Sequence, residues 1–151
     1  MPSAPLPDLG CACATLRRAA RLVTQLYSHE MGNTDMGHTM EPAQYSLLCA
    51  MSAQPGLNQS RLSAALGLDK TTMSRNLRLM KTYGWIKTAG TGDRRESGYV
   101  LTANGKKMLS SVKPSWARAQ ARLRSRLEPR DWETLFEVLG RVSVAALPAD
   151  E

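Results

Sequence analysis

The chain has 151 residues, of which 42% are hydrophobic, enough for one packed domain with or without dimerising arms. No segment reaches the apolar length of a membrane span, and the Pro-rich start MPSAPLPDLG lacks the basic and apolar regions of a secretory signal. Three cysteines do not make a disulfide framework, so we expect a cytoplasmic protein with free thiols.

The first predicted element is an amphipathic helix from about residue 9 to residue 31. Its apolar stripe consists of Leu9, Cys13, Leu16, Ala20, Val23 and Tyr27. The arginines at 17, 18 and 21 lie away from that stripe. We expect residues 1–8 to form a disordered tail, and residues 9–41 to form an N-terminal dimerisation helix followed by a polar loop.

A helix-turn-helix is predicted next. Pro42 opens a helix that ends at the turn 54–56. The following apolar positions bury one face of two short helices that meet at an angle: Leu62, Leu66, Leu68, Met73, Leu77 and Met80. Gly67 supplies the turn between them, and Asp69 is a good N-cap for the second helix.

The polar face of that second helix suits DNA. It carries short hydrogen-bond donors and long cations, which match phosphate oxygens and base edges in a major groove: Lys70, Thr71, Thr72, Ser74, Arg75 and Arg78. Other helical hairpins share some of this pattern, so the helix-turn-helix needs independent support.

A two-stranded hairpin provides that support. Residues 85–88 and 98–101 read as strands joined by the glycine-containing loop 90–97. At its tip, Asp93 can orient one arginine of the pair Arg94 and Arg95 and leave the other to enter a narrow minor groove. A solvated turn with an internal ion pair is the alternative, but the position directly after a helix-turn-helix favours a DNA-binding wing.

Charge is concentrated on this region. From residue 70 to residue 107 there are nine Lys or Arg, including Lys87, and only two acidic residues, so the local excess of +7 equals that of the whole chain. A positive field at the proposed reading surface is what phosphate binding requires. A membrane surface would also attract it, but no basic helix with a broad apolar face accompanies these charges.

The C-terminal segment is predicted to be helical. Thr102 caps a helix that Pro114 interrupts or bends, and Glu128 and Pro129 start the last helix. That last helix has a broad apolar stripe: Trp132, Leu135, Phe136, Leu139, Val142 and Ala146. The small central module could hardly cover it, so we expect burial in a homodimer; folding back into a monomeric core is the alternative.

The fold class is therefore mainly α with a small β wing. A winged helix-turn-helix over residues 42–101 is flanked by dimerisation helices over residues 9–41 and 102–151. The pattern resembles the MarR (multiple antibiotic resistance regulator) family of bacterial transcription factors over roughly residues 9–147. The motifs that carry the resemblance are Leu62-Ser-Ala-Ala-Leu-Gly-Leu-Asp69, Thr72-Met-Ser74, Tyr83-Gly-Trp-Ile86, Asp93-Arg-Arg95 and Leu101-Thr102 with Gly105.

The resemblance implies a homodimeric regulator, usually a repressor, on a pseudo-palindromic operator. It places Arg95 in the minor groove with Asp93 as its orienter. It also implies release from DNA when a small molecule or an oxidant acts near the interface between the DNA-binding lobe and the dimerising helices; a pocket between the first, second and fifth helices could hold an aromatic carboxylate beside Cys13 and Tyr27.

The cysteines leave several hypotheses open. The spacing of Cys13 and Tyr27 is similar to the organic-hydroperoxide-sensing branch of the family, in which a thiolate hydrogen-bonds a tyrosine of the partner subunit. A buried, inert Cys13 is the alternative. Cys11 and Cys13 could also bind a soft metal ion or arsenite, although residues two apart point about 200° around a regular helix. The two histidines, His29 and His38, match no metal motif.

Enzymatic function is disfavoured. The chain has no Gly-rich phosphate loop, no nucleophile elbow and no paired carboxylates in an apolar setting. A thiol oxidoreductase based on the two neighbouring cysteines would be the best enzymatic candidate, and a winged helix used only for protein contacts is a third class. We therefore predict a non-enzymatic regulator without a cofactor, whose partners are double-stranded DNA and a second copy of itself.

Overall fold

The computed structural model describes residues 7, 9–32, 37, 39–90 and 97–148. Within them lie eight elements: α1 (Ala12–Met31), α2 (Pro42–Ala53), α3 (Gln59–Leu66), α4 (Lys70–Thr82), β1 (Ile86–Ala89), β2 (Gly98–Leu101), α5 (Ala103–Arg124) and α6 (Pro129–Ala145). The predicted N-terminal tail, residues 1–8, falls outside the described residues except for Pro7.

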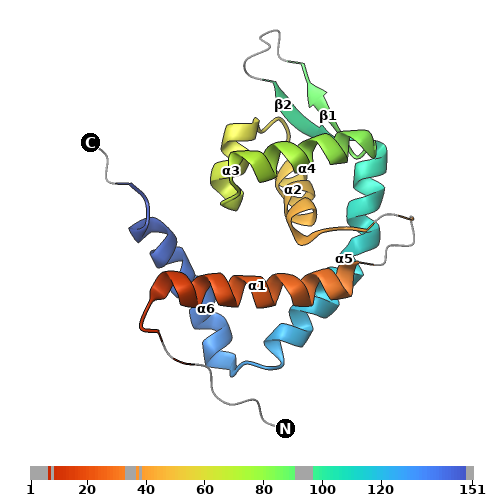
Figure 1. Cartoon of the computed structure of the whole chain (residues 1–151). Helices are drawn as coiled ribbons and strands as arrows, with labels where there is room; N and C mark the ends of the chain where they lie inside the picture. The colour runs from red at the N-terminus through yellow and green to blue at the C-terminus, as the bar shows by residue number, and fades with distance from the viewer. Residues whose placement is uncertain (1–6, 8, 33–36, 38, 91–96, 149–151) are drawn as a thin grey trace.

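The helices form two parts joined by α5 (Figure 1). One end holds α2, α3, α4 and the β hairpin, which we call the helix-turn-helix lobe. The other end holds α1 and α6, and α5 runs from the hairpin to that end. The structure confirms the fold class, since the described chain is mostly helical and carries one two-stranded antiparallel sheet.

Helix α1 begins three residues later than predicted. Gly10 adopts φ +57°, in the left-handed region, and Cys11 is extended at φ −116° and ψ 110°. A left-handed residue cannot continue a right-handed helix, so the predicted start near Leu9 is wrong. Leu9 belongs to the segment that approaches the helix.

The strands pair in the register Ile86 with Leu101 through Ala89 with Gly98. The first strand starts at Ile86 rather than at the predicted Trp85. Trp85 instead closes the end of α4, because its N–H donates to the Met80 carbonyl at 2.9 Å, while its own carbonyl accepts from the Thr102 N–H at 3.0 Å.

Helix α5 continues through Pro114, so the interruption allowed for at this residue is not present. Proline removes one backbone donor and crowds one carbonyl. The flanking turns are held by packing of α5 against both α1 and α2, which keeps the helix in one piece.

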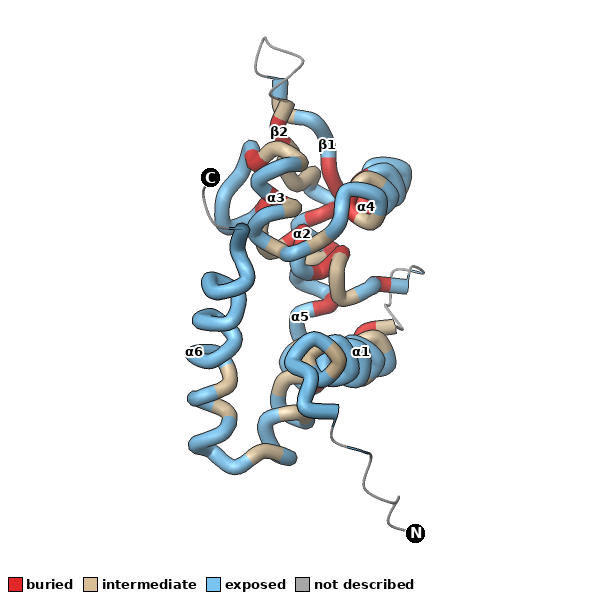
Figure 2. Tube along the Cα trace, turned by 60° about the vertical axis from the view of Figure 1, so that its left-hand side comes forward, coloured by how far each residue is buried: buried red, intermediate tan, exposed pale blue. Residues whose placement is uncertain are grey.

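The hydrophobic core lies in the helix-turn-helix lobe and at the adjoining half of α5 (Figure 2). Methionine and leucine dominate its least exposed side chains: Met31, Met40, Leu47, Leu48, Met51, Leu62, Met73, Met80, Met108, Val112 and Trp85. Straight and γ-branched side chains of this kind fill irregular gaps between short helices.

The other end of the chain is poorly covered. Among the described residues α6 has none buried and α1 has only Met31. Large apolar side chains remain exposed there: Leu9, Leu22, Phe136, Val138, Leu139, Val142, Val144 and Leu147. The alternative in which these helices complete a monomeric core is therefore wrong for the chain by itself. None of the described helices is long and apolar enough to cross a bilayer.

Candidate nucleic-acid interface

The start of α4 is built by its N-cap. The Asp69 carboxylate accepts from the Thr72 N–H at 2.9 Å and from the Thr72 hydroxyl at 2.6 Å. These bonds from Thr72 hold the pKa of Asp69 below its ordinary value, because they favour the charged carboxylate. The predicted cap is confirmed, and it fixes the first turn of the helix that carries the proposed reading face.

The turn between α3 and α4 depends on Gly67, which has φ +62° and donates its N–H to the Ser63 carbonyl at 2.9 Å. This is the left-handed C-cap that glycine adopts without a steric penalty. Buried Leu62 and Met73 then pack the two helices together.

A polar contact that sequence reasoning missed also joins the two helices. Gln59 Nε2 donates to the Ser74 hydroxyl oxygen at 2.8 Å. The two residues are 15 positions apart and on different helices, so no spacing rule within one helix could have paired them. Gln59 therefore links α3 to α4 through a side-chain hydrogen bond.

The predicted reading residues divide into two groups. Lys70, Thr71, Arg75 and Arg78 are exposed along one face of α4. Thr72 and Ser74 are half-buried and already bonded to Asp69 and Gln59. The exposed face offers three cations and a hydroxyl to a ligand outside the lobe, while the other two hydroxyls support the helix.

The hairpin leaves the same lobe beside α4 (Figure 1). Lys87 is exposed on β1, where it pairs with Val100. The predicted wing-tip residues Asp93, Arg94 and Arg95 lie outside the described residues. The described part of the hairpin thus adds one exposed cation to the polar face of α4.

The two N-terminal cysteines flank the start of α1. Cys11 is its extended N-cap and Cys13 lies in its first turn, and both side chains are exposed. The guanidinium of Arg17 donates to the Cys13 sulfur at 3.7 Å. The interpretation of Cys13 as a buried, inert thiol is therefore wrong for the chain by itself.

Tyr27 lies four turns along α1 from Cys13, about 21 Å away at the α-helical rise. Its hydroxyl donates instead to Gln120 Oε1 on α5. Burial raises the pKa of Tyr27. Within one chain, Cys13 and Tyr27 do not form a common site.

A cavity of about 420 Å³ lies between α1, α5 and α6. Its lining has no charged side chain and consists of Leu16, Ala19, Ala20, Val23, Tyr27, Gln120, Leu123, Trp132, Leu135, Phe136 and Leu139. The predicted pocket was placed between the first, second and fifth helices beside Cys13. The cavity that includes Tyr27 is bounded by the sixth helix instead of the second, and Cys13 does not line it.

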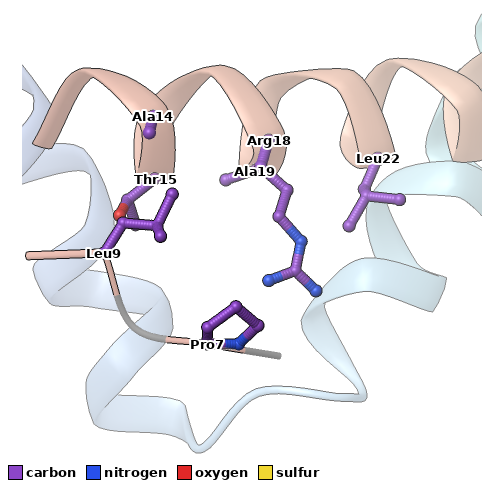
Figure 3. Close-up of a pocket in the computed structure, with 7 residues that line it drawn as sticks. All are labelled: Pro7, Leu9, Ala14, Thr15, Arg18, Ala19 and Leu22. Atoms are coloured by element: carbon purple, nitrogen blue, oxygen red, sulfur yellow. The ribbon is translucent and has the colours of Figure 1, made fainter. Parts of the chain in front are cut away.

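A second cavity, of about 410 Å³, lies between the N-terminal segment and α1. Figure 3 shows Pro7 and Leu9 beneath the helix, with the Arg18 side chain extending toward Pro7. The remaining lining is Ala14, Thr15, Ala19 and Leu22. The exposed Leu9 and Leu22 make this an open hollow rather than a sealed site.

The third cysteine has a different environment. Cys49 is half-buried on α2, and burial raises its pKa, although a hydrogen bond with Tyr45 and the charge of Lys113 act in the opposite direction. Burial is also the main cause that raises the pKa of Tyr45 to about 12. Burial therefore makes Cys49 a poorer nucleophile than an exposed thiol.

No metal centre is assembled by the described residues, which contain no group of three or more His, Cys, Asp or Glu side chains able to hold one ion. His29 is exposed near the end of α1, and His38 lies outside the described residues. Cys11 and Cys13 would need a donor from elsewhere to complete a soft-metal site.

Comparison with known proteins identifies the lobe. A family model described as the MarR family matches residues 38–96. A search of curated proteins finds no match. The M. tuberculosis transcriptional regulator MosR is 28% identical over 90% of this chain and 97% of its own, with a TM-score of 0.75.

Two further solved structures share the whole fold. MosR in complex with DNA is 29% identical over 91% of this chain and 99% of its own, with a TM-score of 0.73. PcaV from Streptomyces coelicolor, in complex with its natural ligand, is 23% identical over 95% of this chain and 99% of its own, with a TM-score of 0.78. In its helix-turn-helix, its wing and these matches, the chain is similar to the MarR family of winged helix-turn-helix transcriptional regulators.

Proposed function

We propose that the protein is a homodimeric, sequence-specific DNA-binding regulator that acts as a repressor. The observation that carries this proposal is the capped helix α4, whose exposed face presents Lys70, Thr71, Arg75 and Arg78 beside the hairpin. The structure of MosR with DNA, at 29% identity, supports the same use of this lobe. In the proposed complex α4 enters the major groove.

The wing completes the proposed interface. Arg95 enters the adjacent minor groove, with Asp93 orienting its guanidinium, while Arg94 and Lys87 bind phosphates. Thr72 and Ser74 are half-buried, and in this proposal they support the DNA-binding face by holding α4 in place through their bonds to Asp69 and Gln59.

Dimerisation would give the protein its operator symmetry. The exposed apolar side chains of α1 and α6 are the surface that a second copy would cover. Two copies of α4 related by a two-fold axis would read half-sites one helical turn apart on a pseudo-palindromic operator.

An anisotropy titration against duplex DNA from the upstream region of the protein's own gene tests this function. We expect specific binding that weakens steeply with salt, with log K falling by about 0.9 for each neutralised phosphate. Arg95→Ala should weaken it severely, whereas Arg130→Ala, which removes one positive charge from the first turn of α6, should not. Binding that ignores both sequence and salt would contradict the proposal, and unchanged affinity of the Arg95→Ala variant would contradict the wing assignment.

We further propose that a small ligand or thiol oxidation releases the protein from DNA. The exposed Cys13, with Arg17 at 3.7 Å, is the group placed for oxidation. An organic hydroperoxide would convert its thiol to a sulfenic acid and itself to the alcohol, transferring one oxygen atom. Any pairing of that group with Tyr27 would form between two subunits, and Cys11 would be the neighbouring thiol.

The same titration, run reduced and after treatment with cumene hydroperoxide, tests this switch. Binding should be lost on oxidation in the wild type and retained in Cys13→Ser. Cys49→Ser is the matched control, because its thiol is half-buried and should leave the response intact. If the oxidant does not change DNA binding, the hypothesis of a thiol switch is rejected and release by a small ligand remains. The uncharged cavity between α1, α5 and α6 is then the place to search for that ligand.

A further inference from the structure

The second strand of the hairpin is joined to the helix-turn-helix as well as to β1. The Tyr99 N–H donates to the Leu57 carbonyl at 3.0 Å, and the Gly56 N–H donates to the Tyr99 carbonyl at 3.0 Å. Leu57 is buried just before α3 begins. The root of the wing is therefore fixed to the entrance of α3 by a backbone pair on the edge of β2 that does not face β1.

This pairing depends on the absence of a side chain at position 98. A Cβ atom on Gly98 would lie 2.0 Å from the Gly56 carbonyl oxygen and 2.4 Å from its carbonyl carbon. Both are backbone atoms, so neither can move aside as a flexible side chain would. Gly56 itself has φ +87°, which keeps the segment before Leu57 in its tight turn.

The side chain of Tyr99 reaches a third element. The ammonium of Lys81, in the last turn of α4, lies 5.2 Å from the centroid of the Tyr99 ring. A cation at that distance is attracted by the electrons of the ring face. Tyr99 thus connects the entrance of α3 through its backbone, the end of α4 through its ring, and β1 through its pairing with Thr88.

We propose that Gly98 and Tyr99 are positioning residues that fix the root of the wing relative to α4, so that the wing and α4 engage DNA together. This inference rests on the proposed DNA-binding function. The major and minor grooves lie at a set separation, and a wing held in advance at that separation loses less conformational entropy on binding. Neither residue needs to touch DNA for this role.

A double-mutant cycle with the wing arginine tests the inference. We expect Gly98→Ala to weaken operator binding by about as much as Arg95→Ala, on the order of tenfold. The double variant should be weaker than either single variant by no more than about twofold, since a misplaced wing no longer delivers the arginine. Arg75→Ala should keep its full effect in the Gly98→Ala background, because α4 still enters its groove.

The second variant pair separates positioning from general destabilisation. Tyr99→Leu removes the ring and keeps the backbone pair, whereas Tyr99→Phe keeps the ring over Lys81. In the Tyr99→Leu background, Arg95→Ala should cause a smaller loss of operator affinity than in the wild type, and in the Tyr99→Phe background it should cause the full loss. The thermal midpoint and the mass of each variant show whether it is folded and assembled like the wild type. Arg95→Ala costing the same in all backgrounds would overturn the inference while leaving the DNA-binding function standing. Absence of specific binding by the wild type would overturn both.

Discussion

The exposed cations of the helix-turn-helix lobe lie on two kinds of element. Arg75 projects from the middle of α4, the helix proposed to enter the major groove, and Lys87 projects from β1 at its side. A guanidinium in the groove can bind a base edge with two hydrogen bonds, whereas an ammonium beside the groove acts as a point charge on phosphate.

Arg75→Ala should therefore change which bases are tolerated in the operator, at a cost of about 1–3 kcal/mol. Lys87→Ala should weaken all sequences alike and reduce the salt slope by about 1. Selection from a random DNA pool, followed by titrations at several salt concentrations, measures both effects. The division of roles is wrong if the two variants select the same sequences with the same loss.

Asp69 links helix capping to pH. Bonds from Thr72 lower its pKa in the folded protein, so its ionisation stabilises the fold above the unfolded pKa, and this contribution is lost as pH falls through the folded pKa. Asp69→Asn keeps a capping oxygen and does not titrate. We expect the wild type to have the higher thermal midpoint at pH 7 and the difference to vanish between about pH 5 and about pH 2. A difference in thermal midpoint that stays constant across this pH range would contradict a charged cap. Asp69→Ala, which removes the capping oxygen, should be the least stable of the three proteins at neutral pH.

At the scale of the element, local signals placed the helix-turn-helix and misplaced other boundaries. Asp69, Gly67 and Thr102 were identified because caps and turns act within a few residues. The late start of α1 follows from the left-handed backbone of Gly10, and the shift of β1 follows from the bonds of Trp85. Such choices depend on contacts that a periodic pattern does not contain.

The turn between α3 and α4 gives an element-scale prediction. A Cβ at Gly67 would meet nothing within 4 Å, so Gly67→Ala should cost only the left-handed backbone penalty, about 1–2 kcal/mol. Gly140 in α6 has equally open surroundings but helical backbone, so Gly140→Ala should stabilise by about 0.5–1 kcal/mol. Chemical denaturation measures both. If both substitutions change the free energy of unfolding in the same direction, the left-handed backbone is not the reason for glycine at position 67.

At the scale of the whole molecule, the main feature is the exposed apolar surface at the end of the chain that holds α1 and α6. Leu139 on α6 is 38% exposed and lies on the apolar stripe with Trp132 and Leu135, while Thr134 lies on the opposite side of the helix. An ion pair joins α1 to α5 there, because the Glu30 carboxylate accepts from the Arg122 guanidinium at 2.8 Å. The ion pair therefore joins α1 to α5, while the apolar side chains of α6 stay exposed and accessible to a second copy.

Leu139→Asp should convert the proposed dimer to a monomer and weaken operator binding strongly, because a charge on the stripe would be buried without a partner. Thr134→Asp introduces the same charge on the other side and should preserve both properties. Light scattering after size-exclusion chromatography gives the mass, and the anisotropy titration gives the affinity. A dimeric Leu139→Asp variant would locate the interface elsewhere.

The sequence by itself determined the order of the elements, the helix-turn-helix with its caps, the wing strands and the concentration of positive charge on that lobe. Each of these depends on interactions between residues close in the chain. Tertiary structure decided the rest: the pairing of Gln59 with Ser74, of Tyr27 with Gln120 and of Tyr99 with Leu57 and Lys81, the exposure of Cys13, and the position of the cavity against α6. Most of these contacts join elements that are distant in the chain, and the exposure of Cys13 depends on what packs around α1. Their geometry therefore follows from how the helices pack, which the periodicity of the sequence does not encode.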